Sequence, residues 1–171
     1  MRKKQFLLAA FALVLLNTVK LRAQTNFEVP AGIEFTVKED YAKHEANVIA
    51  ASKWLEENDL DKELQKRKEV SAFVMKWIMG SPTVNVSLTP QLMKVYGKNS
   101  NLLVIYMGSY TRFYLENKST ATSPAATKAG LISMMNVYKK GIEITKNKEM
   151  EKVIKAADDN KLDDYITDKF K

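Results

Sequence analysis

The sequence predicts a mainly α-helical protein, a compact bundle of about five to six helices with at most a small two-stranded β ribbon. Apolar residues recur at three- and four-residue steps over most of the chain, which is the period of an amphipathic helix. Two stretches begin at a proline and end at a glycine, the asymmetry typical of helix starts and stops. Strand-like alternation is confined to two short segments, 33–37 and 83–88.

The two alternating segments predict the ribbon. Residues 33–37 read IEFTV and residues 83–88 read TVNVSL, so every second side chain is apolar in both. Pairing them gives a two-stranded ribbon, which is stable only when it packs against helices.

Two helices are expected in the first half of the chain. Residues 39–57 carry an apolar face at helical spacing, and Asn58-Asp59 ends it. The next helix starts near Asp61, a good N-cap, and runs to Gly80. Gly80 suits the left-handed position just past a helix, and Pro82 prevents continuation.

The second half reads as further helices. A short one runs from Pro90 to Gly97, and residues 100–117 are apolar on nearly every side in the first two turns, which predicts the central core helix. Another runs from about 124 to Gly141. The tail, 146–171, has the spacing of two short amphipathic helices joined around Asp158–Asn160. Neither an internal repeat nor a linker is visible, so residues 24–171 are expected to form a single helical domain.

The N-terminus has the three parts of an export signal. Basic residues Arg2, Lys3 and Lys4 precede the eleven apolar residues FLLAAFALVLL, and Ala23 is a small residue at which a signal peptidase could cut. Eleven helical residues reach only about 16 Å, short of the ~30 Å of a membrane core. We expect residues 1–23 to be a signal peptide and no stable membrane span to remain after its removal. The alternatives are a buried core helix or an uncleaved anchor.

Absence of cysteine rules out disulfides and a lipid attached to cysteine. The expected mature protein is therefore exported, periplasmic or secreted, and soluble rather than a lipoprotein.

The net charge of +7 reflects this N-terminus more than the domain. Five basic residues and no acidic ones lie in 1–23, which leaves 22 basic and 20 acidic residues and a net of +2. The cluster Lys66-Arg67-Lys68 is flanked by Glu63 and Glu69, which predicts an ion-paired surface. Nucleic acid is not an expected partner, because phosphate binding needs a basic patch.

Known catalytic and cofactor motifs are missing from the sequence. The chain has one histidine, His44, on an apolar helical face, and lacks G-x-S-x-G, S-x-x-K and glycine-rich phosphate loops. The clustered acids of the tail fail the EF-hand pattern; they are Asp158, Asp159, Asp163 and Asp164. We expect neither catalytic residues, nor a metal, nor a cofactor.

The aromatic residues are the most suggestive feature. Tyr106, Tyr110 and Tyr114 recur at four-residue steps on the expected central helix, and Trp77 adds bulk elsewhere. One interpretation is a groove, lined by these four residues, for a small apolar ligand or a partner helix. The other is that they fill the core with each hydroxyl at an edge, and the helical spacing favours it.

Two stretches carry a resemblance. They are WLEENDLDKELQKRKEVSAFVMKWIMGSPTVNVSL and NSNLLVIYMGSYTRFYLEN. Together they resemble a family of uncharacterised exported bacterial helical proteins, over about residues 39–140. A looser likeness is to small helical periplasmic immunity proteins, which share an export signal, a helix ending in glycine, an extended loop and a second apolar helix. The resemblance implies no catalytic residue.

The expected function is a non-catalytic interaction or ligand-binding module, for example an envelope inhibitor or immunity-type protein. Its partner would be a protein or a small apolar ligand. The alternative is a hydrolase of envelope polymers that uses carboxylate or tyrosine residues, which requires two acids facing each other across a cleft.

Overall fold

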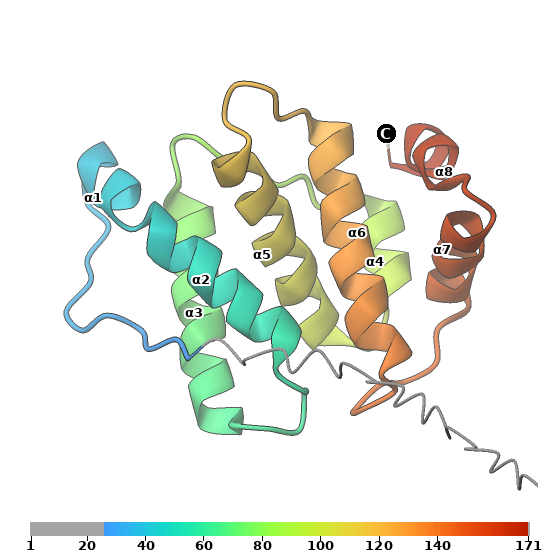
Figure 1. The fold of residues 1–171 in the computed structure, drawn as a ribbon, viewed down its shortest axis with the longest axis horizontal. Helices are drawn as coiled ribbons and strands as arrows, with labels where there is room; N and C mark the ends of the chain where they lie inside the picture. The colour runs from blue at the N-terminus through green and yellow to red at the C-terminus, as the bar shows by residue number, and fades with distance from the viewer. Residues whose placement is uncertain (1–25, 171) are drawn as a thin grey trace, which may run out of the picture.

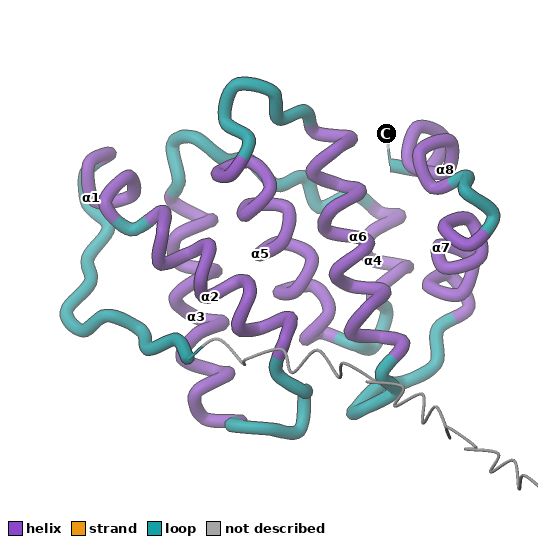
Figure 2. Tube along the Cα trace, in the orientation of Figure 1, coloured by secondary structure: helices purple, strands orange, loops and turns teal. Residues whose placement is uncertain are grey.

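The computed structural model describes residues 26–170, and every regular element in that range is a helix (Figures 1 and 2). The eight helices are α1 (Lys38–Lys43), α2 (Glu45–Glu57), α3 (Leu64–Gly80), α4 (Pro90–Tyr96), α5 (Ser100–Glu116), α6 (Ser123–Lys139), α7 (Lys148–Asp158) and α8 (Leu162–Lys169). The mainly α prediction is confirmed, whereas the predicted helix number of five to six is too low. The expected signal peptide and Ala23 lie outside the described residues.

Helix α5 is the centre of the bundle. It packs against α2 and α3 on one side and α6 on the other, and also contacts α4. Figure 1 shows α7 and α8 on the far side of α6 and α4 from α2. One continuous apolar core extends from Phe27 to Ile166. Among residues 26–170, no helix combines the length and apolar character needed to cross a membrane.

Small residues let the neighbouring helices approach α5 closely. Gly130 of α6 lies so near Tyr106 that a Cβ would be 2.7 Å from the ring carbon Cδ2 and 3.0 Å from the backbone oxygen. On the other side, a Cβ on Gly108 would lie 3.0 Å from the Ser52 hydroxyl of α2. The hydroxyls of Ser109 and Ser133 hydrogen-bond across α5 and α6 at 2.7 Å. These contacts set the spacing of the three central helices.

The stretch expected to form one helix over 39–57 is broken at His44. That residue has φ −104° and ψ 6°, so α1 ends there and α2 begins at the next residue. The break lets Tyr41 pack beside Phe35 and Trp77, with ring centroids 5.0 and 6.0 Å away. Packing against α3 therefore overrides the helical period, which is one reason for the larger helix number.

Helix α3 ends at Gly80 as predicted, but its start and the conformation of Gly80 differ from the prediction. The helix starts at Leu64 rather than near Asp61, because Glu63 adopts a left-handed conformation with φ 44° and ψ 46°. Gly80 is the last helical residue and is not among the glycines with positive φ. Its role is spatial instead, since a Cβ there would overlap the hydroxyl of Tyr41.

The predicted ribbon is absent from the described residues. Segments 33–37 and 83–88 do not pair as strands, and Ile33, Phe35 and Val86 pack against the core instead. Phe35 lies against the ring of Phe73 on α3, at 6.1 Å between centroids. Val84 is buried in the core. The alternation predicted the inward side chains only in part, because Val37 and Leu88 are 54% and 52% exposed.

Helix boundaries marked by proline and glycine are confirmed. Thr89 caps α4 by accepting a hydrogen bond from the Leu92 N–H at 3.2 Å, and Gly97 follows the helix with φ 55°. Gly141 has φ 71°, which the absence of a Cβ permits. The tail forms α7 and α8 as expected.

Arg67 departs from the expected ion-paired surface. Its guanidinium is buried and donates to the carbonyl oxygens of Leu55, Asn58 and Asp59 at 3.1, 2.6 and 3.0 Å. It also lies over the ring of Trp54, 5.5 Å from the centroid. Burial lowers the pKa of Arg67 from its ordinary value. The Arg67 side chain thus links α3 to the end of α2, because it donates hydrogen bonds to carbonyl oxygens that have no partner within α2.

Replacing Gly130 with alanine tests the close approach of α5 and α6. The added Cβ must displace the Tyr106 ring or its backbone, so we expect Gly130→Ala to lower the free energy of unfolding by about 1–3 kcal/mol, although alanine favours helices. Urea denaturation measures this change. Asn136→Ala, at an exposed position of α6, is the control and should alter stability by less than about 0.5 kcal/mol. An unchanged or raised stability for Gly130→Ala would contradict the packing described.

Candidate functional site

A pocket of about 300 Å³ opens beside the tyrosines of α5. Its walls come from α5, from the start of α6, from α8 with the residue that follows it, and from the segment that leads into α4. We call it the Tyr pocket. Ten residues line it: Ser87, Thr89, Tyr106, Tyr110, Ser123, Pro124, Thr127, Ile166, Thr167 and Phe170.

The floor of the Tyr pocket is buried and its rim is exposed. Tyr106 and Tyr110 are only 2% and 3% exposed, so just an edge of each side chain reaches the pocket. Thr127 and Ile166 complete the buried floor. The rim consists of exposed or half-buried residues from three elements. A ligand would therefore meet a floor whose side chains are held by the core.

Most residues that line the Tyr pocket carry a hydroxyl group, although its accessible surface is more apolar than polar. Seven of the ten lining residues are serine, threonine or tyrosine, and none carries a charge. The Tyr106 hydroxyl donates to the Thr127 hydroxyl at 3.4 Å, a long hydrogen bond. The hydroxyls of Tyr114 and Ser123 are 3.2 Å apart. This arrangement can donate and accept hydrogen bonds without holding a charge.

Burial keeps the tyrosine hydroxyls protonated. It raises the pKa of Tyr106 to about 12, and the hydrogen bond to Thr127 only partly opposes this. The pKa of Tyr110 is also raised, mainly by burial, with Ser123 acting in the opposite direction. At neutral pH both groups are phenols that can donate a hydrogen bond.

The structure brings together part of the predicted groove. Tyr106 and Tyr110 line the pocket, and Tyr114 reaches it through the hydrogen bond to Ser123. Trp77 does not line it: this side chain is fully buried, and its indole N–H donates to the Tyr41 carbonyl at 3.0 Å. The sequence leaves core packing and pocket lining open as alternatives. In the structure Tyr106 and Tyr110 do both.

Sequence reasoning missed the opposite wall. Thr127 lies one turn into α6, and Ile166, Thr167 and Phe170 come from the tail. The sequence predicts a helix from about residue 124 and an amphipathic tail, but only as separate elements. Only the packing of α8 on α6, with the Lys128–Asp163 ion pair at 2.6 Å, brings them to the tyrosines.

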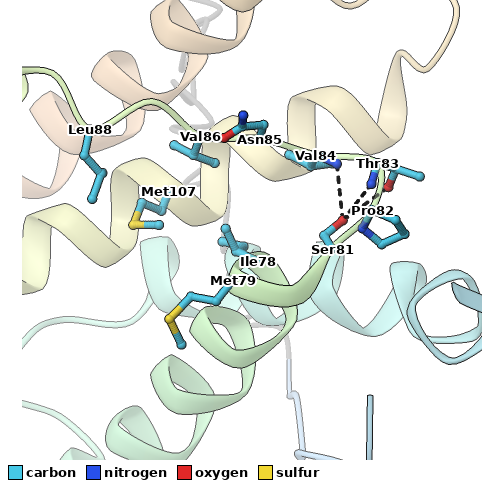
Figure 3. A pocket seen from close by; sticks show the side chains of 10 residues that line it. All are labelled: Ile78, Met79, Ser81, Pro82, Thr83, Val84, Asn85, Val86, Leu88 and Met107. Carbon is cyan, nitrogen blue, oxygen red and sulfur yellow. Dashed lines mark hydrogen bonds between the residues drawn. The ribbon is translucent and has the colours of Figure 1, made fainter. Parts of the chain in front are cut away.

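A second hollow, of about 490 Å³, lies between the end of α3 and segment 81–88 (Figure 3). We call it the Met79 groove. Ile78, Val84 and Met107 form its buried apolar base, while Met79 and Leu88 are 74% and 52% exposed. Figure 3 shows Ser81 accepting hydrogen bonds from the N–H groups of the Thr83 and Val84 backbone, at 3.3 and 3.2 Å. Polar and apolar atoms contribute comparably to the accessible surface of this groove, whereas the accessible surface of the Tyr pocket is mostly apolar.

No family model, curated protein or solved structure matches this chain. The resemblances noted from the sequence therefore remain predictions, and the function is argued from the pockets themselves.

The acidic residues needed by a hydrolase are not found in the Tyr pocket. Its lining contains neither Asp nor Glu. The half-buried Glu56 is paired with Arg112 at 3.0 Å. Within residues 26–170, no three or more His, Asp or Glu residues form a group that could hold a metal ion. The Tyr pocket offers residues with hydroxyl groups and apolar surface.

Alkaline pH tests the burial of Tyr106. Its folded pKa of about 12 lies above the unfolded value of about 10. The associated stability is therefore complete below pH 10 and is lost as pH rises towards 12, by up to about 3 kcal/mol. We expect Tyr106→Phe to show a smaller loss between pH 9 and 12 in urea denaturation.

Thr127→Val is the control for this titration, because it removes the hydrogen bond and keeps the phenol. It should retain the alkaline loss of stability. Identical pH profiles for Tyr106→Phe and the unsubstituted protein would contradict the assignment.

Proposed function

We propose that this protein is an exported, non-catalytic ligand-binding module whose site is the Tyr pocket. The observation that carries the proposal is the buried floor of an open pocket, formed by three residues that carry hydroxyl groups, Tyr106, Tyr110 and Thr127. Concave sites with a few fixed polar groups are the usual form of small-molecule sites.

The chemistry of the lining favours binding over catalysis. A general base or nucleophile works best when its pKa lies near the operating pH. The phenols of Tyr106 and Tyr110 have pKa values raised above the ordinary value of 10, which makes them weak bases and nucleophiles at neutral pH. Hydrogen-bond donation is the role that remains.

The pocket is also held in place by the fold. Gly130 permits the Tyr106 ring to lie flush against α6, and α8 is linked to α4 by the hydrogen bond from Gln91 to the Tyr165 hydroxyl at 2.9 Å. Because these walls are already fixed, binding a ligand costs less conformational entropy of the protein.

A fragment screen on the ¹⁵N-labelled full chain tests this function. We expect small fragments to shift the amide signals of Thr127 and Ile166 saturably. Thr167→Trp places a large ring at the exposed rim and should weaken that binding at least tenfold by filling the pocket. Thr120→Trp, at an exposed loop position, is the matched control and should leave it unchanged.

Two results would overturn the proposal. One is that fragments saturate only the Met79 groove, as seen from the amides of Met79 and Met107. The other is that Thr167→Trp leaves every fragment affinity as it was.

Export is tested by the N-terminus of the protein made in a diderm bacterial host. We expect the periplasmic or secreted product to start at Gln24, because Ala23 is the small residue of the expected cleavage site. Ala23→Phe should block cleavage, while Thr25→Phe should leave it intact. Intact-mass spectrometry of each fraction distinguishes these products. A chain that keeps residues 1–23 and stays in the cytoplasm would contradict export.

A further inference from the structure

We propose that the Tyr pocket binds a neutral, polyhydroxylated six-membered ring of monosaccharide size. This inference rests on the proposed function and names the class of ligand for the same site. It changes the small apolar ligand expected from the sequence into a polar, uncharged one.

The volume of the pocket limits the size of the ligand. About 300 Å³ corresponds to about ten water molecules at about 30 Å³ each. A single sugar or cyclitol ring has about twelve non-hydrogen atoms and fits this space with a few groups at the rim. A longer oligosaccharide would have to extend past the exposed residues Ser87 and Ser123.

Charge in the ligand is disfavoured by the lining. None of the ten lining residues is ionised at neutral pH. The nearby pair Lys128 and Asp163 neutralise each other at 2.6 Å. A charged ligand would lose hydration on the buried floor without gaining an opposite charge.

The start of α6 offers little to an anion. A helix N-terminus binds anions through its free N–H groups, but here most of them are used or missing. Pro124 has no N–H, the Ala125 N–H donates to the Thr122 hydroxyl at 3.4 Å, and the Ala126 N–H donates to the Thr122 carbonyl at 3.0 Å. In the first turn only the Ser123 N–H remains to bind an anion. A phosphate or carboxylate group therefore finds no set of several free N–H groups there.

Hydroxyl groups on the floor disfavour a purely apolar ligand. An apolar ring would cover the small exposed parts of Tyr106, Tyr110 and Thr127, which are 2%, 3% and 8% exposed, and would form no hydrogen bond with their hydroxyls. The 3.4 Å bond from Tyr106 to Thr127 is long enough to yield to a better acceptor. Ligand hydroxyls donate and accept in the same way, so they can satisfy both tyrosines and Thr127.

Apolar surface in the pocket matches the rest of such a ring. Ile166, Pro124 and Phe170 contribute carbon surface between the hydroxyl groups. A saturated polyol ring presents C–H faces between its hydroxyls, which can pack on these side chains while the hydroxyls bond to the floor. This alternation of polar and apolar contacts is what selects the ring over a linear polar molecule.

Binding of D-glucose, D-galactose, N-acetylglucosamine and myo-inositol tests the proposal on the ¹⁵N-labelled full chain. We expect at least one to saturate the Thr127 and Ile166 amide shifts with a dissociation constant on the order of 1 mM, the affinity typical of about twelve atoms. Cyclohexanol, a ring of the same size with one hydroxyl, should bind at least threefold more weakly. Affinity should not change between 20 and 500 mM NaCl, because no charge is involved.

Isosteric variants locate the hydrogen bonds. Thr127→Val and Tyr110→Phe should each weaken binding of the polyol about three- to tenfold and leave cyclohexanol unaffected. Thr111→Val is the matched control, because Thr111 is a buried hydroxyl of α5 that does not line the Tyr pocket. It should leave polyol binding unchanged.

The outcomes separate this inference from the proposed function. Saturation of the pocket by inorganic phosphate or by phenol, with no polyol binding, overturns the ligand class and leaves the binding module standing. If no probe and no fragment binds at the Tyr pocket, both the ligand class and the proposed binding function are overturned. Equal affinity for myo-inositol and cyclohexanol, or equal loss of affinity for Thr111→Val and Thr127→Val, also overturns the ligand class.

Discussion

The close approach of α6 to α5 is the constraint on which most of this structure depends. Gly130 leaves space that the Tyr106 ring and backbone occupy, and Gly108 does the same for α2 at Ser52. A Cβ at Gly130 would require the Tyr106 ring to shift, and one at Gly108 would require Ser52 to give way slightly, because protein interiors have little free volume. The same contact that sets the helix spacing also orients Tyr106, so the floor of the Tyr pocket follows directly from how the bundle is packed.

The outer elements complete what α5 and α6 begin. The tail is joined to the bundle by the ion pair of Lys128 and Asp163 and by the hydrogen bond between Gln91 and Tyr165. Through these links α8 lies opposite the tyrosines and supplies Ile166 to the buried floor. The pocket thus combines four segments that are distant in the chain, which is a common property of ligand sites and the reason that no short motif marks it.

The uncharged lining of the pocket agrees with the near balance of charge over residues 24–171. Outside residues 1–23 the basic and acidic residues nearly balance, so there is no strong field to steer a charged ligand. The aromatic stripe predicted either a groove or a filled core with each tyrosine hydroxyl at an edge. In the structure the Tyr106 ring is buried in the core and its hydroxyl donates to Thr127, which lines the pocket.

The sequence by itself determined where most helices lie and that α5 is central, because helical periodicity, the threonine–proline starts of α4 and α6, and Gly97 and Gly141 act within a few residues. It also singled out Tyr106 and Tyr110. The tertiary structure alone decided the break at His44, the unpaired extended segments, the burial of Arg67 and the wall that α8 adds. Each of these depends on contacts between residues distant in the chain, whose partners no local pattern identifies.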